Sequence, residues 1–64
     1  MAFVYMDLNY RNLETRFYGD PVFLKSRYVV GYFTSELEFY VVGGYLISDL
    51  AEKKVSMLNG GNPS

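Results

Sequence analysis

YVVGYFTSELEFYVV, the run from Tyr28 to Val42, is the clearest structural signal of this 64-residue chain. Valine and aromatic residues, which favour strands, fill positions 28–34 and 37–42 on either side of Ser35 and Glu36. Two such runs around a two-residue link predict an antiparallel β-hairpin. The hairpin is therefore the centre from which the rest of the chain is interpreted.

The register of this hairpin determines which side chains enter the core. With Ser35 and Glu36 as the loop, one face carries Val30, Tyr32, Phe39 and Val41, and we expect it to be the core. The other face carries Val29, Phe33, Tyr40 and Val42, and there the Tyr40 ring would cover Gly31. Ser-Glu lacks the Asn or Gly that tight hairpin turns favour, so a shift by one residue, which would exchange the faces, stays open.

The N-terminal half predicts shorter elements. Residues 2–8 are rich in strand formers, residues 9–12 contain two turn-favouring asparagines, and residues 13–18 alternate with the period of a half-exposed strand. Gly19-Asp20-Pro21 breaks that strand, and residues 22–25 are expected to be an edge or connecting segment because proline cannot donate to a ladder.

The C-terminal segment has two interpretations. Gly43-Gly44 is expected to end the hairpin, and residues 45–48 to form one more short strand. Asp49 would then cap a helix over residues 50–58, with Glu52 completing a capping box. In the alternative, residues 45–50 pair with residues 55–58 as a second hairpin.

Together these elements predict an α+β fold, a small antiparallel sheet of four to five strands with one C-terminal helix. An all-β meander or small barrel is the alternative. Residues 1–58 are expected to form one domain and residues 59–64 a flexible tail.

The composition excludes most catalytic chemistry. The chain has neither cysteine nor histidine, so it lacks disulfides, the usual zinc ligands, the commonest general base and the most nucleophilic side chain. Glu36 and Glu38 are the one close acidic pair, and exposed acids beside a turn are ordinary solvating groups. We expect no enzymatic activity, no metal and no cofactor.

No segment predicts membrane insertion or export. The longest apolar region, residues 28–47, is interrupted by Glu36, Glu38 and two glycines, whereas a membrane-spanning helix needs about 20 mostly apolar residues. The N-terminus has no basic region of the kind that signal peptides carry. Cytoplasmic residence is expected.

The abundance of aromatic residues indicates a binding role. The chain has seven tyrosines and five phenylalanines, and in so small a domain most of these rings must serve the core. The hairpin face opposite the expected core is still too apolar to lie in water, so either the helix or another chain is expected to cover it, and large exposed apolar surfaces usually mark interaction sites. We expect a protein-binding module, an accessory, inhibitor or adaptor whose partner is a larger protein, a second copy of itself in a homo-oligomer, or both. The expected contact residues are the side-chain types that interfaces favour, together with one acid: Arg16, Tyr18, Arg27, Glu38 and Tyr40.

Nucleic acid is the competing partner, because basic and aromatic residues alternate in the first half of the chain. In that hypothesis phosphates would contact Arg11, Arg16, Lys25 and Arg27, and bases would stack on Tyr18 or Tyr28. A formal net charge of −1 weighs against it.

Overall fold

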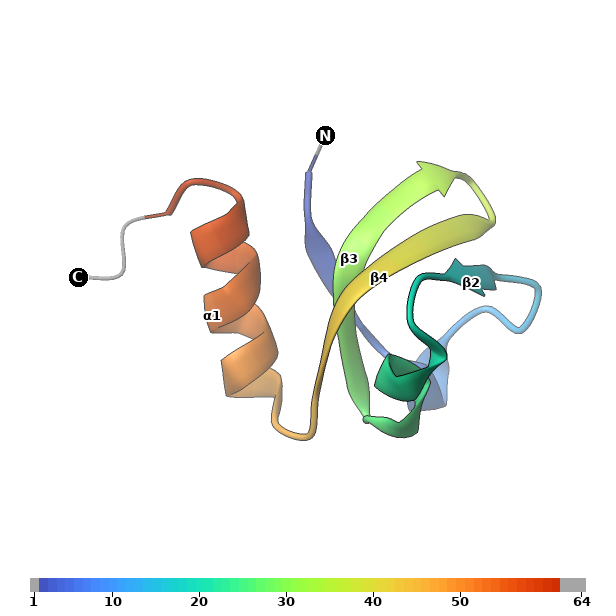
Figure 1. Cartoon of the computed structure of the whole chain (residues 1–64), viewed down its shortest axis with the longest axis horizontal. Helices are drawn as coiled ribbons and strands as arrows, with labels where there is room; N and C mark the ends of the chain where they lie inside the picture. Colours follow the sequence, from blue (N-terminus) through green and yellow to red (C-terminus); the bar gives the residue numbers. More distant parts are fainter. Residues whose placement is uncertain (1, 62–64) are drawn as a thin grey trace.

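The computed structural model describes residues 2–61 and confirms the predicted α+β class (Figure 1). A four-stranded open sheet is followed by one C-terminal helix. In chain order the elements are β1 (Val4–Asp7), the 3₁₀ turn η1 (Leu8–Tyr10), β2 (Arg16–Tyr18), the 3₁₀ helix η2 (Pro21–Lys25), β3 (Tyr28–Ser35), β4 (Glu38–Tyr45) and α1 (Ser48–Leu58).

The sheet has the strand order β1-β3-β4-β2, with the predicted hairpin at its centre. β1 pairs antiparallel with β3, and β3 pairs antiparallel with β4. β2 runs parallel to β4, which differs from the all-antiparallel sheet that we expected. The chain reaches this parallel position because η1 and the turn that follows it carry it across the sheet from β1 before β2 begins.

The register of the hairpin differs from the predicted one. Glu36 and Leu37 form the loop, and Ser35 pairs with Glu38. An irregularity between Phe33 and Ser35 moves the pairing back by one residue, as a β-bulge does, and a second one between Val30 and Gly31 shifts it again. Tyr32 therefore lies opposite Tyr40, and the predicted pairing of Tyr32 with Phe39 is wrong.

The core consequently has a different composition from the predicted face. Val29, Phe39 and Val41 are buried together on one side of the sheet, where Met6, Leu8, Phe17 and Phe23 pack against them. Val30 and Ala51 are also fully buried, and Tyr32 lies on the face where its ring stacks on Tyr40. The predicted core face thus combined residues from both sides of the sheet.

Gly31 is buried at the centre of β3 because the chain leaves no room for a side chain there. It pairs with Val41, and a Cβ atom at this position would collide with the backbone carbonyl of Tyr40 and with the Phe39 ring. The expected cover of Gly31 by the Tyr40 ring is wrong, since the backbone of Tyr40 occupies that space.

The predicted strand over residues 13–18 is shorter than expected. Asn12 accepts a hydrogen bond from the Glu14 amide through its side chain and another from the Thr15 amide through its carbonyl, which makes a turn of residues 12–15. Leu13 is exposed on this turn. The alternation of residues 13–18 therefore reflects a strand only at Arg16–Tyr18.

The connection before β3 is the 3₁₀ helix η2. Asp20 caps it by accepting a hydrogen bond of 3.0 Å from the Val22 amide, and Pro21 occupies its first position. Residues 22–25 are thus a connecting segment, one of the two predicted possibilities.

The C-terminal segment is the predicted helix, with different boundaries. β4 continues through Gly43 and Gly44 to Tyr45, so the expected end of the hairpin at the glycines and the extra short strand are both wrong. α1 begins at Ser48 with Ile47 as its N-cap, and no side chain caps it. Asp49 lies inside the first turn, where its charge favours the helix dipole, and is not the cap we expected.

A side-chain amide fastens the end of α1 to the start of β1. The Asn59 side chain accepts a hydrogen bond of 2.8 Å from the Phe3 amide and donates one of 2.9 Å to the Phe3 carbonyl. Positions 62–64 of the predicted tail lie outside the described residues. Within residues 2–61, no helix is long and apolar enough to cross a membrane.

Candidate functional site

Four aromatic side chains form a row across the face of the sheet opposite to the buried Phe39. We call Phe3, Tyr32, Tyr40 and Tyr18 the aromatic row. The Phe3 and Tyr32 rings meet edge to face with centroids 5.4 Å apart, and the Tyr32 and Tyr40 rings stack with centroids 5.5 Å apart and an interplanar angle of 19°. The row thus extends from the residue before β1, through β3 and β4, to β2.

Strand pairing places these rings together. Tyr32 lies opposite Tyr40 in the hairpin, and Tyr18 lies beside Tyr40 because β2 pairs in parallel with the start of β4. The alternate residues Phe17 and Phe39 point to the other face, into the core. The position of Tyr18 in the row therefore depends on the burial of Phe17.

The outer end of the aromatic row is open. Tyr18 is 44% exposed and Tyr40 is 41% exposed, whereas Tyr32 and Phe3 are half-buried. Exposed tyrosine rings in a row offer a partner a rigid, amphipathic surface, because each ring has few rotatable bonds and carries a hydroxyl group.

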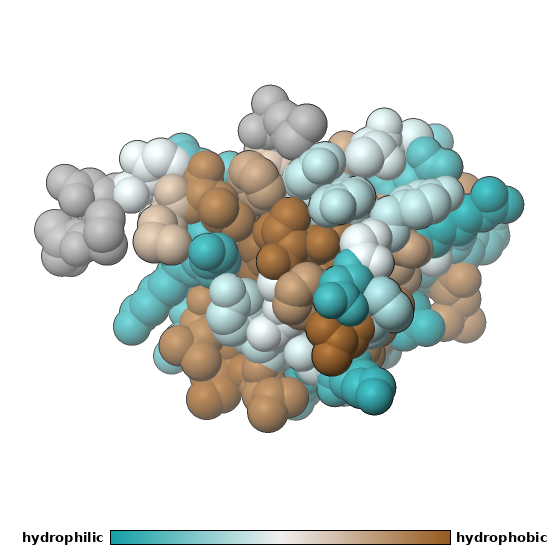
Figure 2. Space-filling view, in the orientation of Figure 1, coloured by the Kyte–Doolittle hydropathy of each residue, from teal (hydrophilic) through white to brown (hydrophobic). Residues whose placement is uncertain are grey.

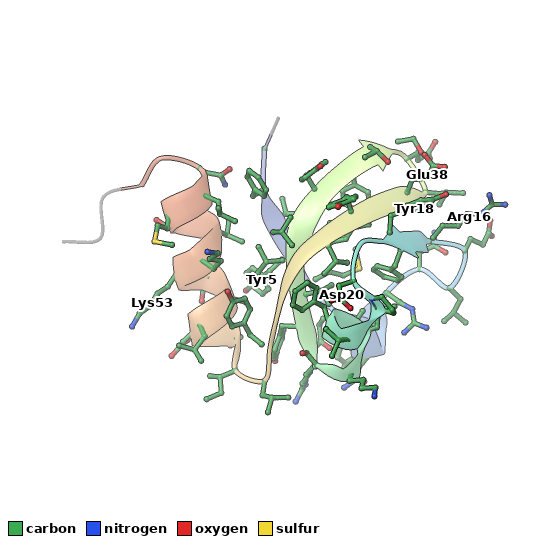
Figure 3. The ribbon with its side chains drawn as sticks, viewed as in Figure 1. Tyr5, Arg16, Tyr18, Asp20, Glu38 and Lys53 are labelled. Atoms are coloured by element: carbon green, nitrogen blue, oxygen red, sulfur yellow. The ribbon has the colours of Figure 1, made fainter. Side chains whose placement is uncertain are left out.

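The carboxylate of Glu38 lies at this end of the row and is held in place by hydrogen bonds. Its oxygens accept hydrogen bonds from the hydroxyls of Thr34 at 3.4 Å, Ser35 at 3.1 Å and Tyr18 at 3.3 Å. Arg16 pairs with Glu38 in the sheet register. Figure 3 shows Arg16, Tyr18 and Glu38 grouped at the start of β4, at the right of the view.

A polar hollow adjoins this group. It has a volume of about 470 Å³ and is lined by Glu14, Arg16, Ser35, Leu37 and Glu38. The Arg16 amide donates a hydrogen bond of 2.7 Å to the Leu37 carbonyl, which holds β2 against the hairpin loop. The aromatic row therefore ends in a region that can bind charged and polar groups.

Four of the five predicted contact residues lie together. Arg16, Tyr18, Glu38 and Tyr40 occupy the open end of the row. Arg27 does not join them, because it precedes β3 at the opposite end of the hairpin. There it forms an ion pair of 3.4 Å with Asp7, and its guanidinium lies 5.3 Å from the centre of the Tyr28 ring.

Phe3 and Tyr32 belong to this surface although the sequence did not predict them as contact residues. Phe3 is distant in sequence from the other rings, and only the pairing of β1 with β3 brings it beside Tyr32. Tyr32 was assigned to the core because the predicted register was wrong. A signal for Tyr32 was available in the possible one-residue shift of the hairpin, whereas none pointed to Phe3.

The cations of the nucleic-acid hypothesis do not line one track. Arg11 lies over the Phe17 ring at 5.8 Å, on the core side of the sheet, and donates a hydrogen bond to the Leu8 carbonyl. Arg16 lies at the hairpin end of the other face, while Arg27 is paired with Asp7. The basic residues of the first half of the chain are thus distributed over separate parts of the molecule.

The aromatic row and Glu38 are equipped for binding. Tyrosine rings can contact apolar and cationic side chains, and a carboxylate that already accepts three hydroxyl hydrogen bonds is held in place for a further donor.

No family model, curated protein or solved structure matches this chain.

Proposed function

We propose that this chain is a non-enzymatic protein-binding module that docks on a larger protein through the aromatic row and acts as an accessory, inhibitor or adaptor. The observation that carries the proposal is the exposure of Tyr18 and Tyr40 at the end of a row of four rings that contact or pair across the whole sheet. The core uses phenylalanine and valine on the opposite face, so these tyrosines are not required to close it.

The arrangement matches the energetics of protein interfaces. Tyrosine and arginine are enriched among the residues whose truncation weakens binding most, and such residues cluster near the centre of an interface. Here Tyr18, Tyr40 and Arg16 lie on adjacent strands, with Glu38 beside them to accept hydrogen bonds. A partner that covers this group would bury aromatic surface and would find donors and acceptors at its rim.

The proposal is tested by affinity capture from native lysate with the tagged full chain as bait. The wild-type chain is expected to retain a specific protein, and the double variant Tyr18→Ala/Tyr40→Ala is expected to lose it. Tyr10→Ala is the matched control, because Tyr10 is highly exposed on η1 and lies outside the aromatic row.

Circular dichroism and thermal unfolding of each bait separate lost binding from lost folding. Retention of the same protein by Tyr18→Ala/Tyr40→Ala at wild-type yield contradicts the proposal. Equal loss of the captured protein with Tyr10→Ala also contradicts the proposal, because it would mean that removal of any exposed tyrosine weakens binding.

A further inference from the structure

An apolar patch lies on α1 and the turn before it, away from the aromatic row. Leu46, Ile47, Leu50 and Met57, here called the α1 patch, are between 47% and 73% exposed. Figure 2 shows hydrophobic side chains gathered at the lower left, where β4 turns into α1. Isolated exposed apolar residues are ordinary, but a contiguous group of this kind marks an interaction surface.

The spacing of the patch is that of a helix-pairing seam. Leu50 and Met57 are seven residues apart within α1, which places them on one side of the helix, and Ile47 precedes them as its N-cap. The side that packs on the sheet is a different one, marked by the buried Ala51 and the half-buried Val55 and Leu58. α1 therefore carries two apolar sides, and the sheet covers one of them.

A hollow beside the seam provides room for side chains of another molecule. It has a volume of about 650 Å³ and lies between Tyr45 and the side of α1 that carries Leu50 and Met57. Lys53 and Lys54 line it as well. Figure 3 shows Lys53 extending from α1 away from the sheet.

The charges along α1 are complementary to those of α1 in a second copy of the chain that runs in the opposite direction. Asp49 lies one turn before Lys53, about 6 Å along the helix axis. If two copies of α1 meet antiparallel about a twofold axis at the level of Ala51, Asp49 of each copy lies level with Lys53 of the other, on the same flank of the seam. The same register places Leu50 within one residue of the axis, and so against Leu50 of the second copy. The apolar and charged matches thus occur in one register.

We propose that the α1 patch is the interface of a symmetric dimer in which α1 pairs antiparallel with α1 of a second copy. A twofold dimer is the commonest form of oligomer and requires a self-complementary surface. This patch meets that requirement through its seam and its paired charges. The inference does not depend on the function of the aromatic row, because it uses other residues.

The direct test is light scattering behind gel filtration on the full chain between about 10 μM and about 1 mM, a range that covers weak dimers. The wild-type chain is expected to change from one copy to two over this range. Leu50→Glu is expected to stay a single copy throughout, with unchanged circular dichroism, because the side chain is exposed in the monomer and central in the dimer. A wild-type chain that remains single, or a Leu50→Glu variant that dimerises as well as wild type, overturns the proposal.

Charge exchange tests the orientation. Asp49→Lys and Lys53→Asp are each expected to weaken the dimer by about twofold to fivefold, as exposed ion pairs do, and the double variant is expected to restore it. Glu52→Lys is the control, with the same change of charge at an exposed position on another side of α1. Absence of rescue in the double variant overturns the antiparallel arrangement.

The chain has no native cysteine, so an introduced cysteine is the one thiol that can form a disulfide between two copies. Leu50→Cys is expected to form a disulfide-linked dimer on mild oxidation, because the two sulfurs lie beside the twofold axis. Glu52→Cys is expected to form none at the same concentration. Equal cross-linking of the two variants overturns the proposed interface.

Discussion

Phe39 is the residue on which the packing of the sheet depends. Its side chain is fully buried, and its ring meets the Phe33 ring at 4.9 Å and the Phe17 ring at 6.0 Å, both edge to face. It therefore joins the hairpin to β2. Phe33, its partner in β3, is about half exposed and leaves much of its surface in water.

Phe39→Ala is expected to lower the free energy of unfolding by about 3–5 kcal/mol, because it removes a buried ring and leaves a cavity. A domain of this size has little more stability than that, so the variant should be largely unfolded at room temperature. Phe33→Ala, the matched control, is expected to cost about 1 kcal/mol, since half its surface is already exposed. Urea unfolding measures both, and equal losses would contradict the packing described for Phe39.

Burial of single residues was predictable only where it did not depend on the register. Phe39 and Val41 were expected in the core, and they are there. Tyr32 was expected beside them and lies on the opposite face, because the irregularity between Phe33 and Ser35 shifts β3 against β4 by one residue. A shift of one residue exchanges the faces of a strand, and no local propensity encodes it.

At the scale of elements, the α1–β1 connection rests on one side chain. Asn59 makes both of its hydrogen bonds to the backbone of Phe3, the first member of the aromatic row. The Leu8 amide bonds to the Arg27 carbonyl on the β3 side, so by strand alternation the polar backbone groups of Phe3 face the outer edge of β1. Asn59 thus covers part of an edge that would otherwise be open.

Asn59→Ala is expected to lower the free energy of unfolding by about 1 kcal/mol, since both bonds are exposed to water. The larger effect should be local: hydrogen exchange at the Phe3 amide should become markedly faster. Asn9→Ala is the control, because among the described hydrogen bonds Asn9 takes part through its backbone amide. Unchanged exchange at Phe3 in Asn59→Ala would contradict the role of Asn59.

The elements differ in how far the sequence predicted them. The hairpin and α1 were recognisable because long runs of strand formers and the spacing of Ala51, Val55 and Leu58 are local signals. The parallel pairing of β2 was not, since it results from the path of residues 8–15 and from the docking of Phe17 on Phe39. The same holds for the candidate site, where residues near the hairpin were predicted and Phe3, which reaches the site only through strand pairing, was not.

The whole molecule carries two separate surfaces. The aromatic row crosses the sheet near the start of β4, while the α1 patch begins beyond the end of β4, and the chain measures 37 × 24 × 20 Å. The proposed self-association and the proposed binding to another protein would therefore use different side chains and need not compete.

Independence of the two surfaces is itself testable. Leu50→Glu is expected to lose the dimer and keep the captured protein, whereas Tyr40→Ala is expected to keep the dimer and weaken capture. Sites with no shared contacts usually act additively, so a variant altered at both positions should show the sum of the two effects. Loss of capture in Leu50→Glu would show that partner binding requires the dimer.

We expect the exposed tyrosines to serve contact with another protein more than they serve folding. The most direct measurement compares, for Tyr40→Ala, the change in affinity for the captured protein by calorimetry with the change in unfolding free energy by urea. We expect affinity to fall by more than about tenfold, the range of interface hot spots, while stability falls by about 1 kcal/mol or less. Unchanged affinity together with a loss of several kcal/mol of stability would contradict the claim, because Tyr40 would then be a structural residue.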